Sequence, residues 1–212
     1  MLYTSYLANK LVDQLLRGQA YTFPTTTYVG LLTSTKGPRA NSTAYALNDT
    51  ISLTANDGKT HLYKCTTAGT TAAAQSTLYP GAFGEAITDG TAVFTEQTNA
   101  ALRPGSAVEA SYTGYSRATV ASSLANWAGT QGAGTTVASS GTSVPTTSNN
   151  GTITVGASAT SGPSYVWAMA LYDAASAGNC LMIEPLTTVK TINNGDPAPT
   201  IAAAALSLSI DN

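Results

Sequence analysis

The chain has 212 residues, which is enough for one large domain or two small domains with a buried core. Charged residues make up only 9% of the chain, compared with about 25% in an average soluble domain. The net charge is -2 and the basic residues are scattered singly, which argues against a nucleic-acid partner. Polar residues interrupt the apolar stretches, so we expect neither a membrane span nor a signal peptide, and a soluble chain made in a cytoplasm.

Residues 5–17 predict one helix near the N-terminus. Leu7, Leu11 and Leu15 recur at four-residue spacing, and polar residues occupy the other side. Gly18 supplies a left-handed stop directly after the last turn. We expect the leucine side of this helix to pack on a sheet.

The rest of the chain predicts short strands, because β-favouring segments alternate with clusters of Gly, Pro, Asn and Ser. The predicted strands are Tyr28–Thr33, Ser116–Val120, Thr152–Ser158, Tyr165–Tyr172, Asn179–Ile183 and Ile201–Ile210. The fold class predicted is therefore mainly β, a β-sandwich with one N-terminal α-helix. The predicted core residues are Leu7, Leu11, Leu15, Val29, Leu31, Trp167, Leu171, Leu206 and Leu208.

The strand predicted at 165–172 is apolar on both faces. Small and apolar residues at even positions alternate with Trp167, Met169 and Leu171 at odd positions. A strand of this kind is covered on each side. One side is expected to meet the domain core and the other to meet the helix or a neighbouring subunit, with Trp167 as a core anchor.

A change in the pattern of strand and turn signals between Arg39 and Leu102 predicts an inserted small β module. Residues 44–96 contain strand signals of their own, with turn signals at Asn56-Asp57-Gly58 and Asp89-Gly90. We therefore predict a discontinuous host domain of residues 1–40 and 102–212, and an inserted module of residues 41–101 that leans on its host.

Candidate catalytic chemistry is sparse. The only histidine, His61, has no acidic residue at ligand spacing, and the acidic residues form no recognisable pair along the chain. Cys65 and Cys180 lie far apart, so isolated thiols are expected, with a disulfide possible if their segments meet in space. We predict no enzyme activity, no metal and no cofactor.

Residues 129–150 are low in complexity and nearly free of large apolar side chains. Such a segment predicts a long loop or arm that becomes ordered where a neighbour fixes it. The segment therefore favours a protein that assembles with neighbouring subunits.

Three segments, "LANKLVDQLLRGQAYTFPTTTYVGLLT", "VEASYTGYSRATV" and "WAMALYDAASAGNCLMIEPLTTVKTINNGDPAPTIAAAALSLSID", occur in an order that resembles a family of tailed-bacteriophage virion proteins. The resemblance implies a non-enzymatic structural component of the virion, assembled in the bacterial host cytoplasm. Its partners would be other virion proteins and copies of itself. A tail, fibre or baseplate position is the first expectation, and head decoration or a neck or collar fibre is the alternative.

The insert has a resemblance of its own. "YALNDTISL", "HLYKCTTAGT" and "GEAITDGTAVFTE" are similar to a small β module of phage tail and fibre proteins, itself reminiscent of chitin-binding-type modules. This likeness implies a further alternative, a module that binds a host-surface glycan. The candidate contact residues for a carbohydrate or a partner are Tyr63, Tyr79 and Phe94, and the competing interpretation is that these rings form the core of the module.

Overall fold

The computed structural model describes residues 2–75, 77–98, 108–129, 132–138 and 145–209. Within these ranges the chain forms one helix and fifteen strands, so the fold is mainly β with an N-terminal helix, as predicted. The elements in chain order are β1 (Leu2–Tyr3), α1 (Ser5–Leu16), β2 (Thr26–Ser34), β3 (Ala44–Tyr45), β4 (Thr50–Thr54), β5 (Thr60–Thr67), β6 (Gly69–Thr70), β7 (Ala86–Asp89), β8 (Ala92–Glu96), β9 (Ala118–Ala121), β10 (Thr146–Ser148), β11 (Ile153–Thr154), β12 (Ser164–Tyr172), β13 (Cys180–Ile192), β14 (Thr200–Ile201) and β15 (Ser207–Ser209).

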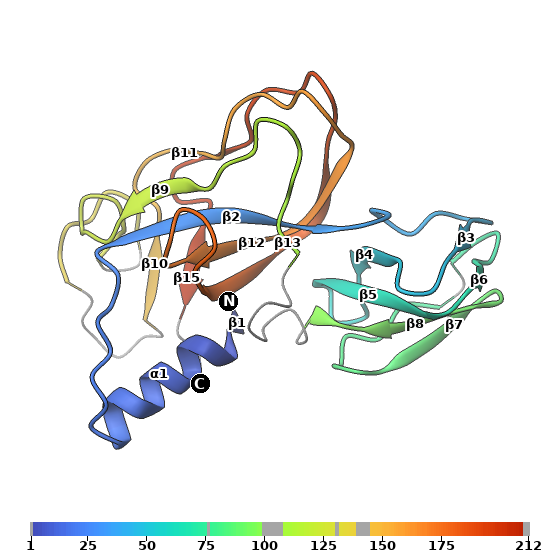
Figure 1. Cartoon of the computed structure of the whole chain (residues 1–212), viewed down its shortest axis with the longest axis horizontal. Coiled ribbons are helices and arrows are strands. Elements are labelled where there is room, and N and C mark those ends of the chain that lie inside the picture. The colour runs from blue at the N-terminus through green and yellow to red at the C-terminus, as the bar shows by residue number, and fades with distance from the viewer. Residues whose placement is uncertain (1, 76, 99–107, 130–131, 139–144, 210–212) are drawn as a thin grey trace.

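The largest sheet has five antiparallel strands in the order β1-β13-β12-β2-β9 (Figure 1). The central strand β12 pairs with β13 on one side and with β2 on the other. One face of this sheet packs against side chains from β11, β14 and β15 to form the main core. The predicted core residues that belong to it are Val29, Leu31, Leu171, Leu206 and Leu208.

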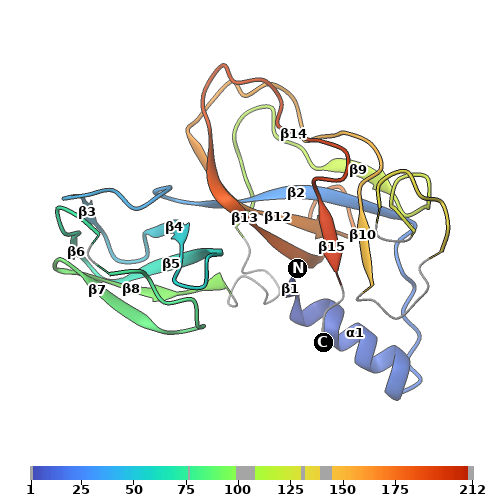
Figure 2. The same ribbon diagram turned by 180° about the vertical axis from the view of Figure 1, so that it is seen from behind.

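A second group of strands lies apart from this sheet. β4, β5, β8 and β7 form a four-stranded sheet, and β3 pairs with β6. We call residues 44–96 the β module and the remaining described residues the body. In Figures 1 and 2 the β module lies at one end of the long axis of the molecule and α1 lies toward the other end.

The chain leaves the body and returns to it at neighbouring points. The Thr33 N–H donates to the Val108 carbonyl over 2.9 Å, and the Ala110 N–H donates to the Leu31 carbonyl over 2.8 Å. The segments on either side of the β module are therefore hydrogen-bonded side by side. Adjacent ends are typical of a domain inserted into a loop, and they support our proposal that residues 41–101 form an insert in a host of residues 1–40 and 102–212.

A bulge at Trp167 changes which residues share a face of β12. The pairing of β12 shifts register between Val166 and Ala168 against both β2 and β13. As a result Trp167 joins the residues at even positions in a second cluster, while Val166 faces the main core. This second cluster also contains Leu62 from β5. The β module thus covers part of the face for which the sequence suggested the helix or a neighbouring subunit.

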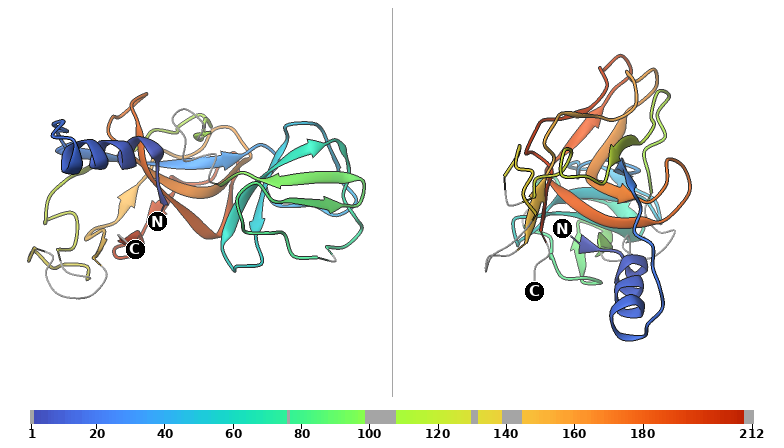
Figure 3. Two further views of the ribbon diagram at one scale, coloured as in Figure 1. Left: turned by 90° about the horizontal axis from the view of Figure 1, so that it is seen from below. Right: turned by 90° about the vertical axis from the view of Figure 1, so that its left-hand side faces the viewer.

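The helix α1 is attached to the sheet by its first turn. The Thr4 hydroxyl accepts from the Leu7 N–H (3.3 Å) and donates to the Cys180 carbonyl (2.6 Å), so one side chain both caps the helix and ties it to β13. Gly18, with φ of +65°, follows the C-cap residue Arg17. The helix then extends away from the sheet, as Figure 3 shows.

The last predicted strand, 201–210, is two strands separated by a turn. Asn149 holds this turn, because its carbonyl accepts from the Ala204 N–H (2.7 Å) and its side-chain oxygen accepts from the Leu206 N–H (2.9 Å). Ala204 has a positive φ of 62°, which interrupts the extended backbone. Ile210 lies outside the described residues.

Candidate functional site

The three aromatic residues proposed for glycan or partner contact lie inside the β module. Tyr63, Tyr79 and Phe94 are fully buried and meet in one cluster, with Tyr63 and Tyr79 packed edge to face at 4.9 Å between ring centres. The Tyr63 hydroxyl donates to the Pro80 carbonyl, and the Tyr79 hydroxyl donates to Asp89. Contact of these rings with a ligand stays a prediction, and it would require the β module to open.

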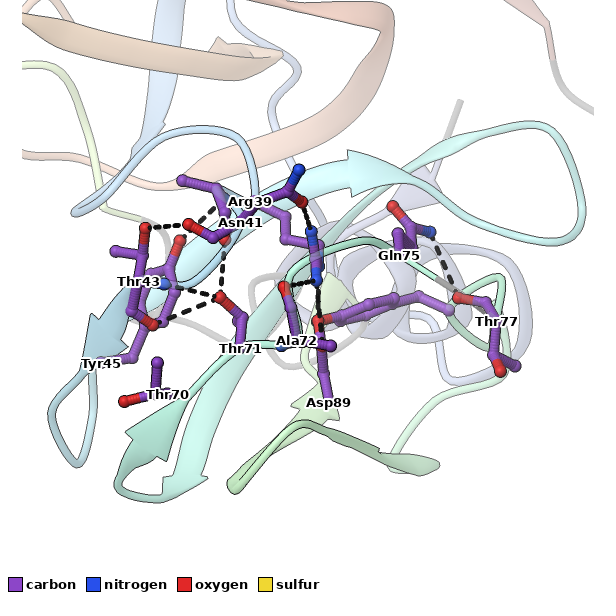
Figure 4. Close-up of polar contacts among 12 residues, drawn as sticks. Arg39, Asn41, Thr43, Tyr45, Thr70, Thr71, Ala72, Gln75, Thr77 and Asp89 are labelled. Atoms are coloured by element: carbon purple, nitrogen blue, oxygen red, sulfur yellow. Dashed lines mark hydrogen bonds and ion pairs between the residues drawn. The ribbon is translucent and has the colours of Figure 1, made fainter.

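A buried ion pair secures the point where the chain enters the β module (Figure 4). The Arg39 guanidinium bonds both oxygens of Asp89, and the two side chains are only 4% and 6% exposed. Asp89 also accepts from the Ala72 N–H (2.9 Å) and from the Tyr79 hydroxyl (2.7 Å). The hydrogen bonds from Arg39, joined by these others, lower the pKa of Asp89 to about 2. The pair fixes the entry segment to the module core.

A second ion pair, which is partly buried, accounts for the arginine of the Gly-Tyr-Ser-Arg segment of the body. Arg117 forms two parallel bonds to Glu109, of 2.8 and 2.7 Å, and also donates to the carbonyls of Ala174 and Ala177. Its guanidinium carbon lies 3.4 Å from the ring centre of Tyr172. Arg117 therefore joins the segment around Glu109 to the loop after β12. Because four of its five N–H donors are occupied within the chain, this arrangement is a structural lock.

A cleft of about 360 Å³ lies between the β module and β13. His61 and Glu96 line one side, and Glu184 and Leu186 line the other. His61 Nδ1 is 2.9 Å from Glu96 Oε1, and His61 Nε2 is 3.0 Å from Asp57 Oδ2. The structure thus brings together a histidine and carboxylates that looked unrelated along the chain. We call this the His61 cleft.

The charges in the His61 cleft are coupled. The hydrogen bond to Glu96 raises the pKa of His61, against the effect of burial, and the bond to Asp57 adds to the rise. Burial opposes the change at Asp57, but the hydrogen bonds from the Lys59 N–H and from His61 lower the pKa of that carboxyl. Because carboxylate oxygens only accept, both ring nitrogens of His61 donate when the ring is protonated.

Sequence reasoning missed this site because the wall formed by Glu184 is distant in sequence from His61. One signal was available, since Asp57 stands in the predicted Asn-Asp-Gly turn immediately before the predicted strand that carries His61. A hairpin turn of this kind places its residues beside the end of the next strand. Glu96, at the end of β8, is then brought to His61 by the pairing of β5 with β8.

The described residues contain no group of three or more His, Cys, Asp or Glu that could hold a metal ion. Cys65 and Cys180 are free thiols. Burial raises the pKa of both, that of Cys180 to about 12, so neither thiol is activated as a nucleophile at neutral pH.

The far end of α1 presents an apolar surface. Leu7 is buried and Leu11 is half-buried, but Leu15 and Leu16 are 75% and 81% exposed. Leu15, which the four-residue spacing placed in the core, lies beyond the part of the helix that touches the sheet. Val12 and Phe23 are also exposed. We call Val12, Leu15 and Leu16 the helix patch.

Comparison with known proteins identifies the family of the chain. The family model described as Podophage GP4 fiber I protein gp80 matches residues 3–100 and residues 59–209. The chain therefore belongs to this family of tailed-phage fibre-like structural proteins. No curated protein matches the chain. In the part of the chain that the structure describes, no helix has the length and apolar character needed to cross a membrane.

Proposed function

We propose that the protein is a non-enzymatic component of a phage fibre that assembles through the helix patch with further copies of itself and with neighbouring virion proteins. The observation that carries this proposal is the exposure of Leu15 and Leu16 at the end of the molecule away from the β module. Large apolar side chains gathered at one exposed place favour a protein contact. The match to a family of fiber proteins also supports this proposal.

A second copy is the occupant that the charges favour. With a net charge of -2 over 212 residues, two chains repel only weakly. The charged residues beside the patch, Asp13 and Arg17, form an ion pair within the helix at 2.9 Å. The charges of Asp13 and Arg17 therefore compensate each other.

Light scattering on the purified full chain tests this assembly. The wild-type chain is expected to form an oligomer, and the double variant Leu15→Ser/Leu16→Ser is expected to be monomeric. The matched control is Leu47→Ser/Leu78→Ser, which changes two exposed leucines in the β module. A wild-type chain that stays monomeric when concentrated, or a control that dissociates as fully as the helix variant, would overturn self-assembly through the patch.

We propose a tail, fibre or baseplate position for the protein in the virion. Immunogold electron microscopy of intact particles with an antibody against residues 41–101 tests this placement. Label on the tail or its tip is the expected result. Label over the head or collar would replace the proposal by the alternative of a decoration or neck protein.

A further inference from the structure

The His61 cleft lies at the junction of the β module and the body, and its two walls come from separate parts of the chain. The hairpin turn between β4 and β5 supplies Asp57, and the end of β8 supplies Glu96. The opposite wall is Glu184 to Thr187 of β13. This wall bulges, because residues 186–189 of β13 stand opposite the single residue Trp167 of β12. Bulges of this kind commonly redirect side chains toward a functional site.

Some hydrogen-bonding groups of the cleft have partners within the described part of the chain, and others do not. Both nitrogens of His61 face carboxylate oxygens, and the Thr98 hydroxyl accepts from the Leu62 N–H (2.9 Å). Glu96 Oε1 accepts from the Thr98 N–H (2.7 Å) as well as from His61. The imidazole donors are thus taken up by the protein.

Two buried oxygens of residues that line the cleft, Glu96 Oε2 and the Thr60 hydroxyl, have no hydrogen-bond partner among the described residues. The Glu96 side chain is 1% exposed. A buried carboxylate oxygen without a donor is costly. The cleft that Glu96 lines is consequently matched to a group that brings hydrogen-bond donors.

From this imbalance we infer that the His61 cleft binds a saccharide whose hydroxyl or amide groups donate to Glu96. Three carboxylates, Asp57, Glu96 and Glu184, line the cleft together with two basic side chains, Lys59 and His61. The carboxylates outnumber the basic groups, and both ring nitrogens of His61 already face carboxylates, so an anionic sugar is disfavoured. Pro185 and Leu186 offer an apolar wall for the C–H face of a sugar ring. The volume of about 360 Å³ lies within the range of small-molecule sites, roughly 300–1,000 Å³.

This inference does not depend on the proposed assembly role, and it moves glycan recognition away from the buried rings of Tyr63, Tyr79 and Phe94. Those rings are enclosed in the β module, whereas the cleft is open between the β module and β13. Recognition at the cleft would also use both parts of the chain. The isolated β module is therefore expected not to reproduce it.

The test uses the full chain and calorimetric titration with three oligosaccharide series of equal length, built from neutral hexoses, N-acetylhexosamines or hexuronic acids. Binding to the neutral or the N-acetylated series is expected, with none to the uronic acids. Thr187→Trp fills the cleft from an exposed position of its wall and should weaken binding by roughly tenfold or more. Glu96→Gln puts an amide donor in place of an acceptor and should weaken binding as well.

Thr188→Trp is the matched control, since Thr188 is the next residue of β13, is also exposed, and does not line the cleft. It should bind as the wild type does, and circular dichroism should show that all three variants are folded. Folded wild-type chain that binds none of the three series would overturn the inference. Binding that survives Thr187→Trp, or that extends equally to the uronic acids, would do the same.

Discussion

The Arg117 guanidinium bonds both oxygens of the Glu109 carboxylate, and the same guanidinium holds the Ala174 and Ala177 carbonyls of the loop after β12. Arg117 and Ala174 are 57 positions apart in the sequence. One side chain thus joins two distant segments of the chain. Gly30 lies directly beside this lock, because a Cβ there would come within 2.9 Å of Glu109 Oε1. The lock leaves no room for a larger residue at that point of β2.

Arg117→Lys is expected to lower the free energy of unfolding by about 2 kcal/mol or more, because lysine cannot reproduce the planar fork. Urea unfolding followed by circular dichroism measures the change. Arg17→Lys is the matched control, since Arg17 pairs with Asp13 on the surface and is 70% exposed. That control should change stability by less than about 0.5 kcal/mol. Equal losses in the two variants would show that the fork at Arg117 is not special.

The lowered pKa of Asp89 predicts that the protein loses stability in acid. Its folded pKa of about 2 lies below the ordinary value of 3.8, so its stabilising contribution is complete above the ordinary value. The contribution, about 2 kcal/mol, is lost as the pH falls toward 2. Urea unfolding between pH 5 and about pH 2 should therefore show a slope that Asp89→Asn reduces.

The Asp89→Asn variant also leaves the buried Arg39 charge without its carboxylate, which costs about 3–5 kcal/mol at neutral pH. Asp13→Asn serves as the control, because it removes a carboxylate from an exposed helix pair. The control should keep the wild-type slope. An unchanged slope in Asp89→Asn would mean that Asp89 does not govern the acid sensitivity.

The raised pKa of His61 predicts that the protein loses stability as the pH rises, whereas the effect of Asp89 appears as the pH falls. Its pKa is raised above the ordinary value of 6.5, so its contribution is fully present below 6.5 and is lost as the pH rises through the folded pKa. The groups that face the ring are the carboxylates of Asp57 and Glu96 and the hydroxyl of Thr98. Stability should accordingly decline on the alkaline side of pH 6.5.

His61 is the only histidine of the chain, so a proton NMR titration of the untagged protein reports on it without ambiguity. The titration should give a pKa above 6.5 in the wild type. Glu96→Gln should move the value downward, because it removes the partner with the largest effect. A wild-type value at or below 6.5 would contradict the arrangement described for the cleft.

Leu62 joins the β module to the body through the cluster around Trp167. Leu62→Ala is expected to cost about 2–5 kcal/mol, because it leaves a cavity in that cluster. Leu47→Ala, which shortens an exposed leucine of the same module, should have little effect. Urea unfolding followed by tryptophan fluorescence compares the two. Similar stabilities would show that the cluster does not couple the two parts.

Local patterns of the sequence predicted much of the fold. The leucine spacing and Gly18 gave the helix almost to the residue, and the apolar run at 165–172 became the central strand β12. These features depend on neighbours within a few positions, which the sequence displays directly. The turn held by Asn149 was not predictable in this way, because its partners lie more than fifty positions away.

The candidate site was harder to predict for the same reason. A bulge at Trp167 moves that side chain to the opposite face, and alternation alone cannot reveal it. Likewise, the approach of β13 to the hairpin turn at Asp57 depends on how the β module docks against the body. The exposed position of Leu15 follows from the direction of α1 away from the sheet, which its own periodicity does not encode.

The neighbouring hydrogen bonds of Thr33 to Val108 and of Ala110 to Leu31 have a consequence for evolution and engineering. On the proposed division, the body closes its own strands before and after the β module. A foreign domain with closely spaced ends could be spliced between these points without changing the strand register of the body. Such a replacement would also have to cover the sheet face around Trp167, against which Leu62 of the β module packs.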